Sequence, residues 1–435
     1  CGADVLREEL LKLGCRQGVH WATRDVSGAS LDPKLVIEAR QMEMEYFRRM
    51  QVYKKVKRQP GMKTIRTRLV DVNKRDIKSP DYRSRLVGME FNDGVDPTLF
   101  AGTPPLEELR AIISIAGTRS RSGSTKKITI NGVKRAHFHA KATRDINVEI
   151  PAEYRLPGEG GVVDKLELCL CGTGDAALNC QRAVQSHLES IGFVSSKAFP
   201  NLYHHPGRDI STLVHGDDYA SCGSGPDLSW SNNNLMNKFG HDKNDEMECK
   251  IPNRIVRAVQ QGWEYEADPR HGKLIVESMG VKDSKGVVTA GVDGNEEEPG
   301  AEVQYLEDKE ATAFRSLAAR GNYLAFDRPD ICYAVKECSR DMAPPNVKSW
   351  DKLKRLAKYL KQNPRLVWKF YWQDEVKVFD TYTDANWAGC RESRKSTSGG
   401  CVLYGNGCVK TWSTTQATIA TSSAESELLA SVKGA

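Results

Sequence analysis

Long apolar runs are absent from the sequence: no stretch approaches the ~18 residues that a membrane-spanning helix needs. We therefore expect no membrane partner. No signal-peptide pattern opens the chain, which begins at Cys1 rather than Met, so we expect an intracellular protein, cytoplasmic or nuclear, and not a secreted one. The closing run "ELLASVKGA" resembles an unfinished helix, and both ends are expected to be cut from a longer reading frame.

Metal-binding cysteine patterns are also lacking. The twelve cysteines form no CxxC pair, and the nine histidines form no Cys/His set with the spacing of a zinc site. These absences argue against a zinc-binding module. Without a secretion signal, the cysteines are expected to be reduced thiols, some of them buried.

Charge is nearly balanced over the whole chain, but it is unevenly distributed. The net charge is +6, and 14 Lys/Arg stand against 5 Asp/Glu between Gln41 and Gly88. A one-sided basic segment predicts a polyanionic partner such as nucleic acid. The alternative is a basic face that contacts only water, and charge alone does not choose between the two.

The length of 435 residues predicts two to four domains, and the hydrophobic periodicity predicts both helices and strands. Helices are expected over 31–56, 104–116, 174–193, 227–240, 311–325, 346–362 and from Ser422 onward. Strands are expected in 63–90, at the start of 126–140, and in 145–151, 211–221, 376–389 and 401–413. The acidic, glycine-bearing segment 291–309 is the best candidate for a linker.

The stretch "STLVHGDDYAS", residues 211–221, places Asp217 and Asp218 side by side at the tip of a predicted hairpin. Adjacent carboxylates repel one another unless positive charge lies beside them, and a divalent cation such as Mg²⁺ is the usual solution. Two such ions ~3.5–4 Å apart can hold the attacking and leaving oxygens of a phosphoryl transfer. Gly-Asp-Asp is also ordinary turn chemistry on an exposed hairpin, so the tripeptide alone leaves both interpretations open.

The order of the segments resembles the reverse transcriptase and ribonuclease H part of a copia-type retrotransposon Pol polyprotein. "DYRSRLVGMEF" resembles the fingers segment of that family, "INGVKRAHFHAKATRDINVEIPAEY" resembles its palm segment, and "LVHGDDYA" stands where the family has its "YVDD" hairpin. "YLAFDRPDICYAV" is similar to the signature of the connection, and "YTDANWAG" with "SSAESELLA" is similar to the opening of ribonuclease H. The resemblance is collinear over nearly the whole chain.

This resemblance implies an α+β fold with right-hand-like fingers and palm, a helical connection and a truncated ribonuclease H fold. The implied boundaries are 1–45 for a helical lead-in, 46–285 for fingers, palm and a thumb-like part, 286–310 for an acidic linker, 311–374 for the connection and 375–435 for ribonuclease H. The implied activity is RNA-directed DNA synthesis, in which a primer 3′-hydroxyl attacks the α-phosphate of a dNTP while Asp217 and Asp218 hold two Mg²⁺ ions. The implied partners are RNA or DNA template–primer, RNA–DNA hybrid and dNTPs.

The palm segment departs from the family pattern. Aligning "VKRA" on the family's "VKTA" puts Gly132 where the first of three metal-binding aspartates belongs, and His137 where an aromatic residue packs under the incoming sugar. Asp145 is a weak candidate for a substitute, since it lies past the end of that segment. In the helix-opening segment, Gly172-Thr173-Gly174-Asp175 replaces most of the family's "LYGLKQAP". We therefore expect an inherited but impaired polymerase site.

A second carboxylate site is implied near the C-terminus. By resemblance, Asp384 and Glu425 are the first two metal ligands of ribonuclease H. "Ser422-Ser423-Ala424-Glu425" is also a capping box, which needs no catalysis. Glu427 lies roughly 200° further round the helix and is expected to face elsewhere.

The next strand of the ribonuclease H family, which bears another acidic ligand, is not within the 435 residues. The sheet edge beside Asp384 is therefore expected to be bare and apolar, and ribonuclease H activity to be absent. Trp387, three residues past Asp384, is expected to be a core residue rather than a platform for base stacking.

Basic residues of the fingers are candidates for contacts with the phosphates of template or nucleotide, namely Lys63, Arg66, Arg68, Arg83 and Arg85. The alternative is a set of solvated side chains on an exposed hairpin. For the whole protein, the rival to an enzyme is a non-catalytic remnant that binds nucleic acid without turnover. A third hypothesis is an unrelated host protein whose turns imitate these motifs, and the collinear order argues against it.

Overall fold

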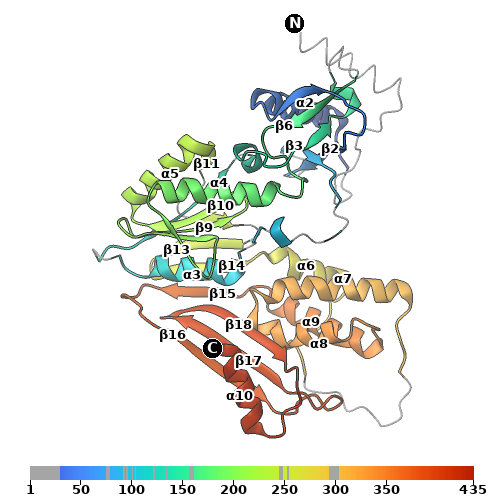
Figure 1. Ribbon diagram of the computed structural model, residues 1–435. Helices are drawn as coiled ribbons and strands as arrows, with labels where there is room; N and C mark the ends of the chain where they lie inside the picture. The colour runs from blue at the N-terminus through green and yellow to red at the C-terminus, as the bar shows by residue number, and fades with distance from the viewer. Residues whose placement is uncertain are drawn as a thin grey trace. The chain divides into compact units, whose positions relative to one another are not determined.

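The computed structural model has the expected α+β composition (Figure 1). It describes residues 30–435, with the exception of 75–78, 92–93, 95–96, 100, 103, 121–122, 134, 156–160, 244–247, 252–253 and 293–302. The chain divides into two compact units, one of residues 1–103 and 133–193 and one of residues 104–132 and 194–435. Most of the expected lead-in 1–45 and much of the expected linker lie outside the described residues, and the five-part division stays a prediction. In the described part of the chain, no helix is long and apolar enough to cross a membrane.

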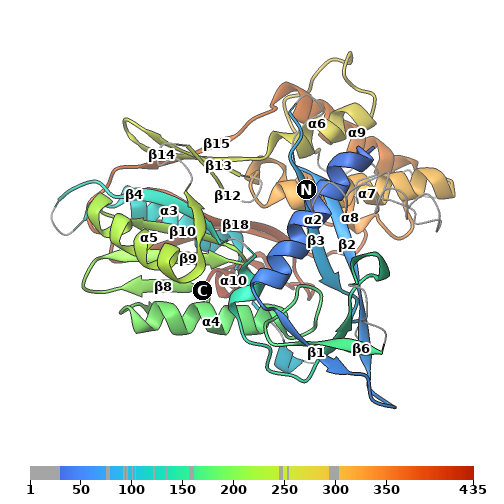
Figure 2. The same cartoon turned by 90° about the horizontal axis from the view of Figure 1, so that it is seen from above.

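The first unit is built on a five-stranded sheet with the strand order β1-β6-β5-β2-β3. Its strands are β1 (Tyr53–Lys57), β2 (Thr64–Asn73), β3 (Tyr82–Gly88), β5 (Asn147–Glu149) and β6 (Val162–Leu166). The helices of this unit are α2 (Pro33–Arg49) and α4 (Ala176–Ser190). Helix α2 packs against β3 and β2, and Figure 2 shows it crossing them.

Helix α2 forms and docks for reasons that are local in the sequence. The Asp32 side chain caps its first turn by accepting a hydrogen bond from the Lys34 N–H (2.8 Å), and Pro33 supplies a preset φ at the start. A buried ion pair of 2.6 Å between Arg40 and Asp71 fixes the helix to β2. Apolar side chains at helical spacing complete the contact, namely Val36, Ile37, Met44 and Phe47.

The second unit begins with a six-stranded sheet of order β11-β4-β10-β9-β8-β7. These strands are β4 (Lys127–Val133), β7 (Val194–Ser195), β8 (Leu202–His205), β9 (Ile210–His215), β10 (Asp218–Gly223) and β11 (His241–Lys243). Helices α3 (Leu106–Gly117) and α5 (Gly225–Phe239) cover opposite faces (Figure 1). Because both faces are covered, β9 and β10 are buried along almost their whole length instead of alternating between core and solvent.

The two faces of this sheet have different chemistry. On the α5 face, Asn131 donates a hydrogen bond of 2.7 Å to Asn232 within the buried layer. On the α3 face, Ile130, Leu213 and Ala220 form an apolar layer with the helix. The same core continues into a second sheet of order β12-β13-β14-β15, made of β12 (Glu248–Ile251), β13 (Arg254–Val259), β14 (Gly262–Ala267) and β15 (Val367–Tyr371).

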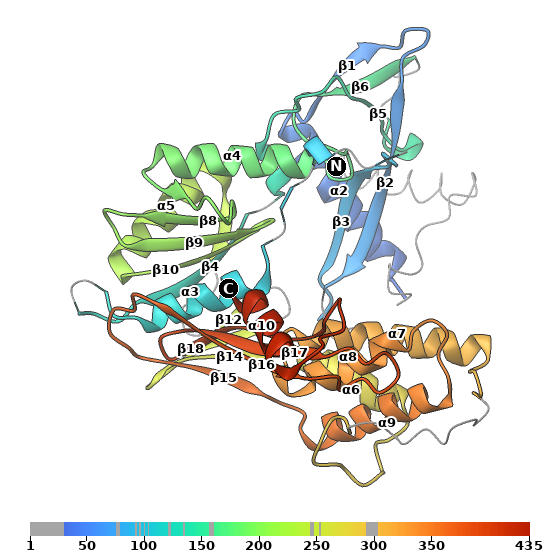
Figure 3. The same ribbon diagram turned by 60° about the horizontal axis from the view of Figure 1, so that its bottom comes forward.

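Four helices form a separate hydrophobic core in the same unit (Figure 3). They are α6 (Pro269–Ser278), α7 (Asp308–Ala325), α8 (Cys332–Arg340) and α9 (Val347–Gln362). A last sheet of order β16-β17-β18 follows, with strands β16 (Phe379–Asn386), β17 (Thr397–Tyr404) and β18 (Gly407–Thr415). Helix α10 (Ser423–Gly434) packs on β16 and β17.

Candidate functional site

The paired aspartates lie at a tight hairpin turn, as the sequence predicts. Strands β9 and β10 are joined by Gly216 and Asp217 alone, and Gly216 has φ +62°, whereas Asp217 is not among the positive-φ residues. This is the pattern of a type II′ turn, in which glycine takes the first central position. Asp217 is exposed at the tip, and Asp218 is half-buried at the start of β10.

Sheet register brings three positions into one row across the sheet. Asp218 pairs with Gly132 of β4 on one side and with His215 of β9 on the other. Side chains of directly paired residues share a face, with Cβ atoms about 4.5–5.5 Å apart. A Cβ atom added to Gly132 would lie 3.5 Å from Oδ1 of Asp218. A carboxylate at position 132 would therefore project beside Asp218, and glycine supplies none.

Basic groups lie on the same face as Asp218. A cavity of about 20 Å³, room for a single water molecule, is lined by Asp218, His215 and Arg254 together with apolar residues of α3 and the sheet. Burial and the nearby Arg254 lower the pKa of His215, and the charge of Asp217 opposes them. Arg254 itself is buried and forms an ion pair of 3.0 Å with Asp327. The protein thus places its own cation near the aspartates.

The side chains at this turn do not fit a complete two-metal centre. Asp217 and Asp218 supply two carboxylates, while the residue of β4 paired with Asp218 is Gly132, which supplies none. Among the described residues, no group of three or more His, Cys, Asp or Glu is arranged to hold a metal ion. Asp145, the weak candidate for a substitute, forms an ion pair of 2.9 Å with Lys165 and is mostly exposed.

The second predicted carboxylate site is only partly assembled. Asp384 is exposed on β16, which is an edge strand of its sheet in the described chain. Thr383 faces α10, with its Oγ1 3.4 Å from that of Ser431. Because side chains alternate along a strand, Asp384 belongs to the opposite face, with Tyr382, which is 60% exposed. The face of β16 that carries Asp384 and Tyr382 is therefore the one that α10 leaves uncovered.

Helix α10 directs a different acid toward this strand from the one expected. Glu425 accepts hydrogen bonds from the hydroxyl (2.7 Å) and the backbone N–H (2.6 Å) of Thr421, which lower its pKa, and Ser422 caps the Glu425 N–H. Glu425 thus takes part in a helix cap. Glu427 accepts a hydrogen bond of 3.1 Å from the N–H of Ala385, next to Asp384. The expectation that Glu427 faces elsewhere was wrong, because the docking of the helix selects which of its faces meets the strand.

Trp387 also differs from the prediction. Its side chain is 47% exposed, so it is not a core residue, although its indole N–H donates a hydrogen bond of 3.1 Å to the carbonyl of Ala420.

Four of the five predicted basic contacts lie on one face of the β2–β3 hairpin. Arg68 pairs with Val87, and Arg85 and Arg83 pair with Val70 and Val72, so the side chains of Arg66, Arg68, Arg83 and Arg85 point to the same side. All four are exposed, and the opposite face is the one that packs against α2. We call this set the arginine face. Lys63 is exposed just before β2.

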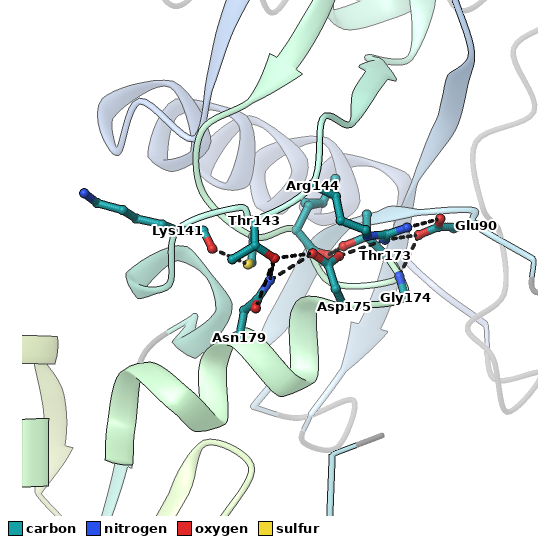
Figure 4. Close-up of polar contacts among 10 residues, drawn as sticks. Glu90, Lys141, Thr143, Arg144, Thr173, Gly174, Asp175 and Asn179 are labelled. Atoms are coloured by element: carbon teal, nitrogen blue, oxygen red, sulfur yellow. Dashed lines mark hydrogen bonds and ion pairs between the residues drawn. The ribbon is translucent and has the colours of Figure 1, made fainter. Parts of the chain in front are cut away.

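An ion triad lies in the first unit, at the segment that departs from the family pattern (Figure 4). Arg144 binds both oxygens of Glu90, at 2.9 and 2.8 Å, and Oδ1 of Asp175 at 2.8 Å. Gly174 adds a backbone hydrogen bond of 2.6 Å to Glu90, and Asn179 donates one of 2.9 Å to Asp175. The triad joins the chain just after β3 to the start of α4. The substituted segment therefore has a structural role that the sequence did not reveal.

Comparison with known proteins gives consistent relatives, although no protein-family model matches the chain. The chain is 25% identical over 419 residues to the retrovirus-related Pol polyprotein from transposon TNT 1-94 of Nicotiana tabacum, covering 92% of this chain and 30% of that protein. It is 26% identical over 355 residues to the retrovirus-related Pol polyprotein from transposon RE1 of Arabidopsis thaliana, covering 80% of this chain and 23% of that protein. The chain thus spans less than a third of the length of these relatives.

A solved structure has a related fold. It is that of a foamy viral protease-reverse transcriptase in complex with double-stranded DNA, and it aligns with a TM-score of 0.50 over 98% of this chain and 68% of that chain, at 12% identity. At this identity the likeness concerns the fold alone, which is of the reverse transcriptase type.

We predict that the ion triad stabilises the first unit in a pH-dependent way. Burial alone would raise the pKa of Asp175, but Arg144 outweighs it and lowers the pKa of both Asp175 and Glu90. Carboxyls with lowered pKa values stabilise the folded state above their unfolded pKa of about 4, and this stabilisation is lost as the pH falls through the folded values. Arg144→Met should cost roughly 2–3 kcal/mol of unfolding free energy at pH 7, because Asp175 is left buried without its cation, and much less at pH 3.

The measurement is the free energy of unfolding in urea at pH 3 and pH 7. Unfolding of the first unit is monitored by the susceptibility of residues 133–193 to proteolysis. Arg182→Met is the matched control, since Arg182 is exposed on α4 and forms no ion pair with another residue that the structure describes. An equal loss of stability at pH 3 and pH 7 would contradict the electrostatic role of the triad.

Proposed function

We propose that the chain is the reverse transcriptase part of a copia-type element whose polymerase centre is impaired, because it is similar over most of its length to retrovirus-related Pol polyproteins of transposons. In this proposal the chain binds template–primer, while DNA synthesis from dNTPs is slow or absent. Asp217 and Asp218 would hold one side of a Mg²⁺ site, and Mg²⁺ when bound supplies the charge that stabilises a phosphoryl transfer.

One observation carries the proposed impairment: the register of β4 against β10 puts Gly132 beside Asp218. The resemblance expects an aspartate at this position, and a side chain there would project beside Asp218. Without it, the attacking oxygen is held less accurately, and a misplacement of even ~1 Å can cost about 10²-fold in rate. The loss of one ligand also weakens the hold on a metal ion.

Nucleic-acid binding is supported by a separate part of the chain. The arginine face offers exposed guanidinium groups at strand spacing, which suits a phosphate backbone and reads no base sequence. The structural neighbour was solved with double-stranded DNA. The second candidate function, a remnant that binds nucleic acid without catalysis, is favoured by the same missing carboxylate.

The ribonuclease H assignment stays a proposal for Asp384 and Glu425. The Glu427 carboxylate also reaches the strand that carries Asp384. Glu427 bonds to the backbone of β16 on the side that α10 covers, whereas the Asp384 side chain belongs to the opposite face, so we propose hydrolysis of the RNA strand of a hybrid only for Asp384 and Glu425, as the resemblance implies.

We predict that Gly132→Asp raises primer extension by about 10²-fold over the wild-type chain with Mg²⁺ or Mn²⁺, because it restores the third carboxylate. The new side chain fits: its Cβ would lie at ordinary contact distance from Asp218, and Gly132 is not among the positive-φ glycines. Gly132→Asn is the matched control of equal shape without the charge, and it should not gain activity. Robust processive synthesis by the wild-type chain would overturn the proposed impairment.

We predict that the double substitution Arg66→Gln/Arg68→Gln weakens binding to a DNA duplex and lowers the slope of log K against log salt by about 2, since each lost phosphate contact removes ~0.9. Fluorescence anisotropy over a salt series measures it. The control is Lys57→Gln/Arg182→Gln, which removes two exposed charges of the same unit outside the arginine face. If both variants lose binding equally, the arginine face has no special role.

A further inference from the structure

A second basic surface lies on helix α9, in the other unit. Lys354, Lys358 and Lys361 follow one another at i, i+4 and i+7, so they share one side of the helix. The opposite side is buried in the helical core through Leu353, Leu356, Ala357 and Leu360. Lys354 is exposed, and Lys358 and Lys361 are half-buried.

The segment after α6 extends this surface. Lys361 donates a hydrogen bond to the carbonyl of Ser284, and Arg355 donates one of 2.8 Å to the hydroxyl of Thr289, so residues 281–290 lie along the second half of α9 (Figure 3). Lys282 and Lys285 of this segment are exposed. We call the combined set the lysine face: Lys282, Lys285, Lys354, Arg355, Lys358 and Lys361.

Among the residues that the structure describes, the positive charge of the lysine face is largely uncompensated. Two acids, Asp283 and Asp351, lie among its six cations, which leaves four positive charges. Arg355 and Lys361 donate to uncharged oxygens, which satisfy their N–H groups without neutralising them. Within the described part of the chain, Lys282, Lys285, Lys354 and Lys358 form no ion pair. By contrast, Lys352, on another side of the helix, is paired with Asp341 at 2.8 Å.

We propose that the lysine face binds the phosphate backbone of a nucleic-acid duplex, as a contact separate from the paired aspartates and the arginine face. This inference rests on the proposed function, since it assigns a further contact to the same partner. Flexible lysines around a helix suit a duplex backbone rather than a single strand, because the neighbouring aromatic residue, Tyr359, is half-buried and its hydroxyl donates a hydrogen bond to Asp330. The contact would add affinity without base preference and would be sensitive to salt.

The test is the double substitution Lys354→Gln/Lys358→Gln, which keeps helix propensity and removes two charges with no partner to disturb. Binding of a labelled random-sequence DNA duplex is measured by anisotropy over a salt series. We expect an affinity loss of at least about tenfold at low salt and a decrease of about 2 in the salt slope. The control is Lys238→Gln/Lys309→Gln, two exposed lysines of α5 and α7 that lie outside the face.

The outcomes separate this inference from the proposed function. An unchanged slope in the Lys354/Lys358 variant, with a reduced slope in the Arg66/Arg68 variant, would overturn the lysine face alone. An equal loss in the Lys238/Lys309 control would overturn it as well, since any lysine would then serve. Binding to vesicles with anionic lipid but not to the duplex would assign the face to a membrane surface and also refute it. If the wild-type chain binds no duplex at all, the proposed function fails.

Discussion

The antiparallel pairing of β10 with β4 and β9 is the constraint on which the site depends. It fixes Gly132, Asp218 and His215 in one row, and the two-residue turn at Gly216 then places Asp217 at the tip. A slip of one residue in either pairing would turn Asp218 to the other face of the sheet. Both faces are buried, by α3 and by α5, so the register is strongly specified. We call the β9–β10 turn with Asp217 and Asp218 the apex. Its chemistry follows from that register and from which side chain occupies each position.

This arrangement also explains how adjacent aspartates are tolerated in a centre that lacks a third ligand. Asp217 is exposed, so water screens its charge, and Asp218 shares a small cavity with Arg254. Arg254 is held by Asp327 from the chain before α8, and Tyr265 binds the same carboxylate. The ion pair and its neighbours therefore connect the apex to the helical core of the same unit. These contacts stabilise the fold around the turn whether or not the site is catalytically active.

Several elements follow from local sequence signals. Pro33 after Asp32 opens α2 within the predicted helix 31–56, and Gly405 before Asn406 joins β17 to β18. The hairpin of β13 and β14 escaped prediction because Gln260 and Gln261 at its turn carry no glycine or asparagine signal, and its other neighbour, β15, lies a hundred residues further along the chain. The orientation of Glu427 and the exposure of Trp387 depend on how α10 and β16 meet, which periodicity within one element does not determine. Likewise, the bond of Asp175 to Arg144 links residues far apart in sequence.

The central claim is that position 132 decides how well the apex holds a divalent cation. The most direct measurement is a titration with Mn²⁺, with the free ion followed by electron paramagnetic resonance, on the wild-type chain, Gly132→Asp, and Gly132→Asp combined with Asp218→Asn. The account predicts weak binding by the wild-type chain, tighter binding by Gly132→Asp, and loss of that gain in the double variant. Tight binding of two Mn²⁺ ions by the wild-type chain, unchanged by Gly132→Asp, would contradict it.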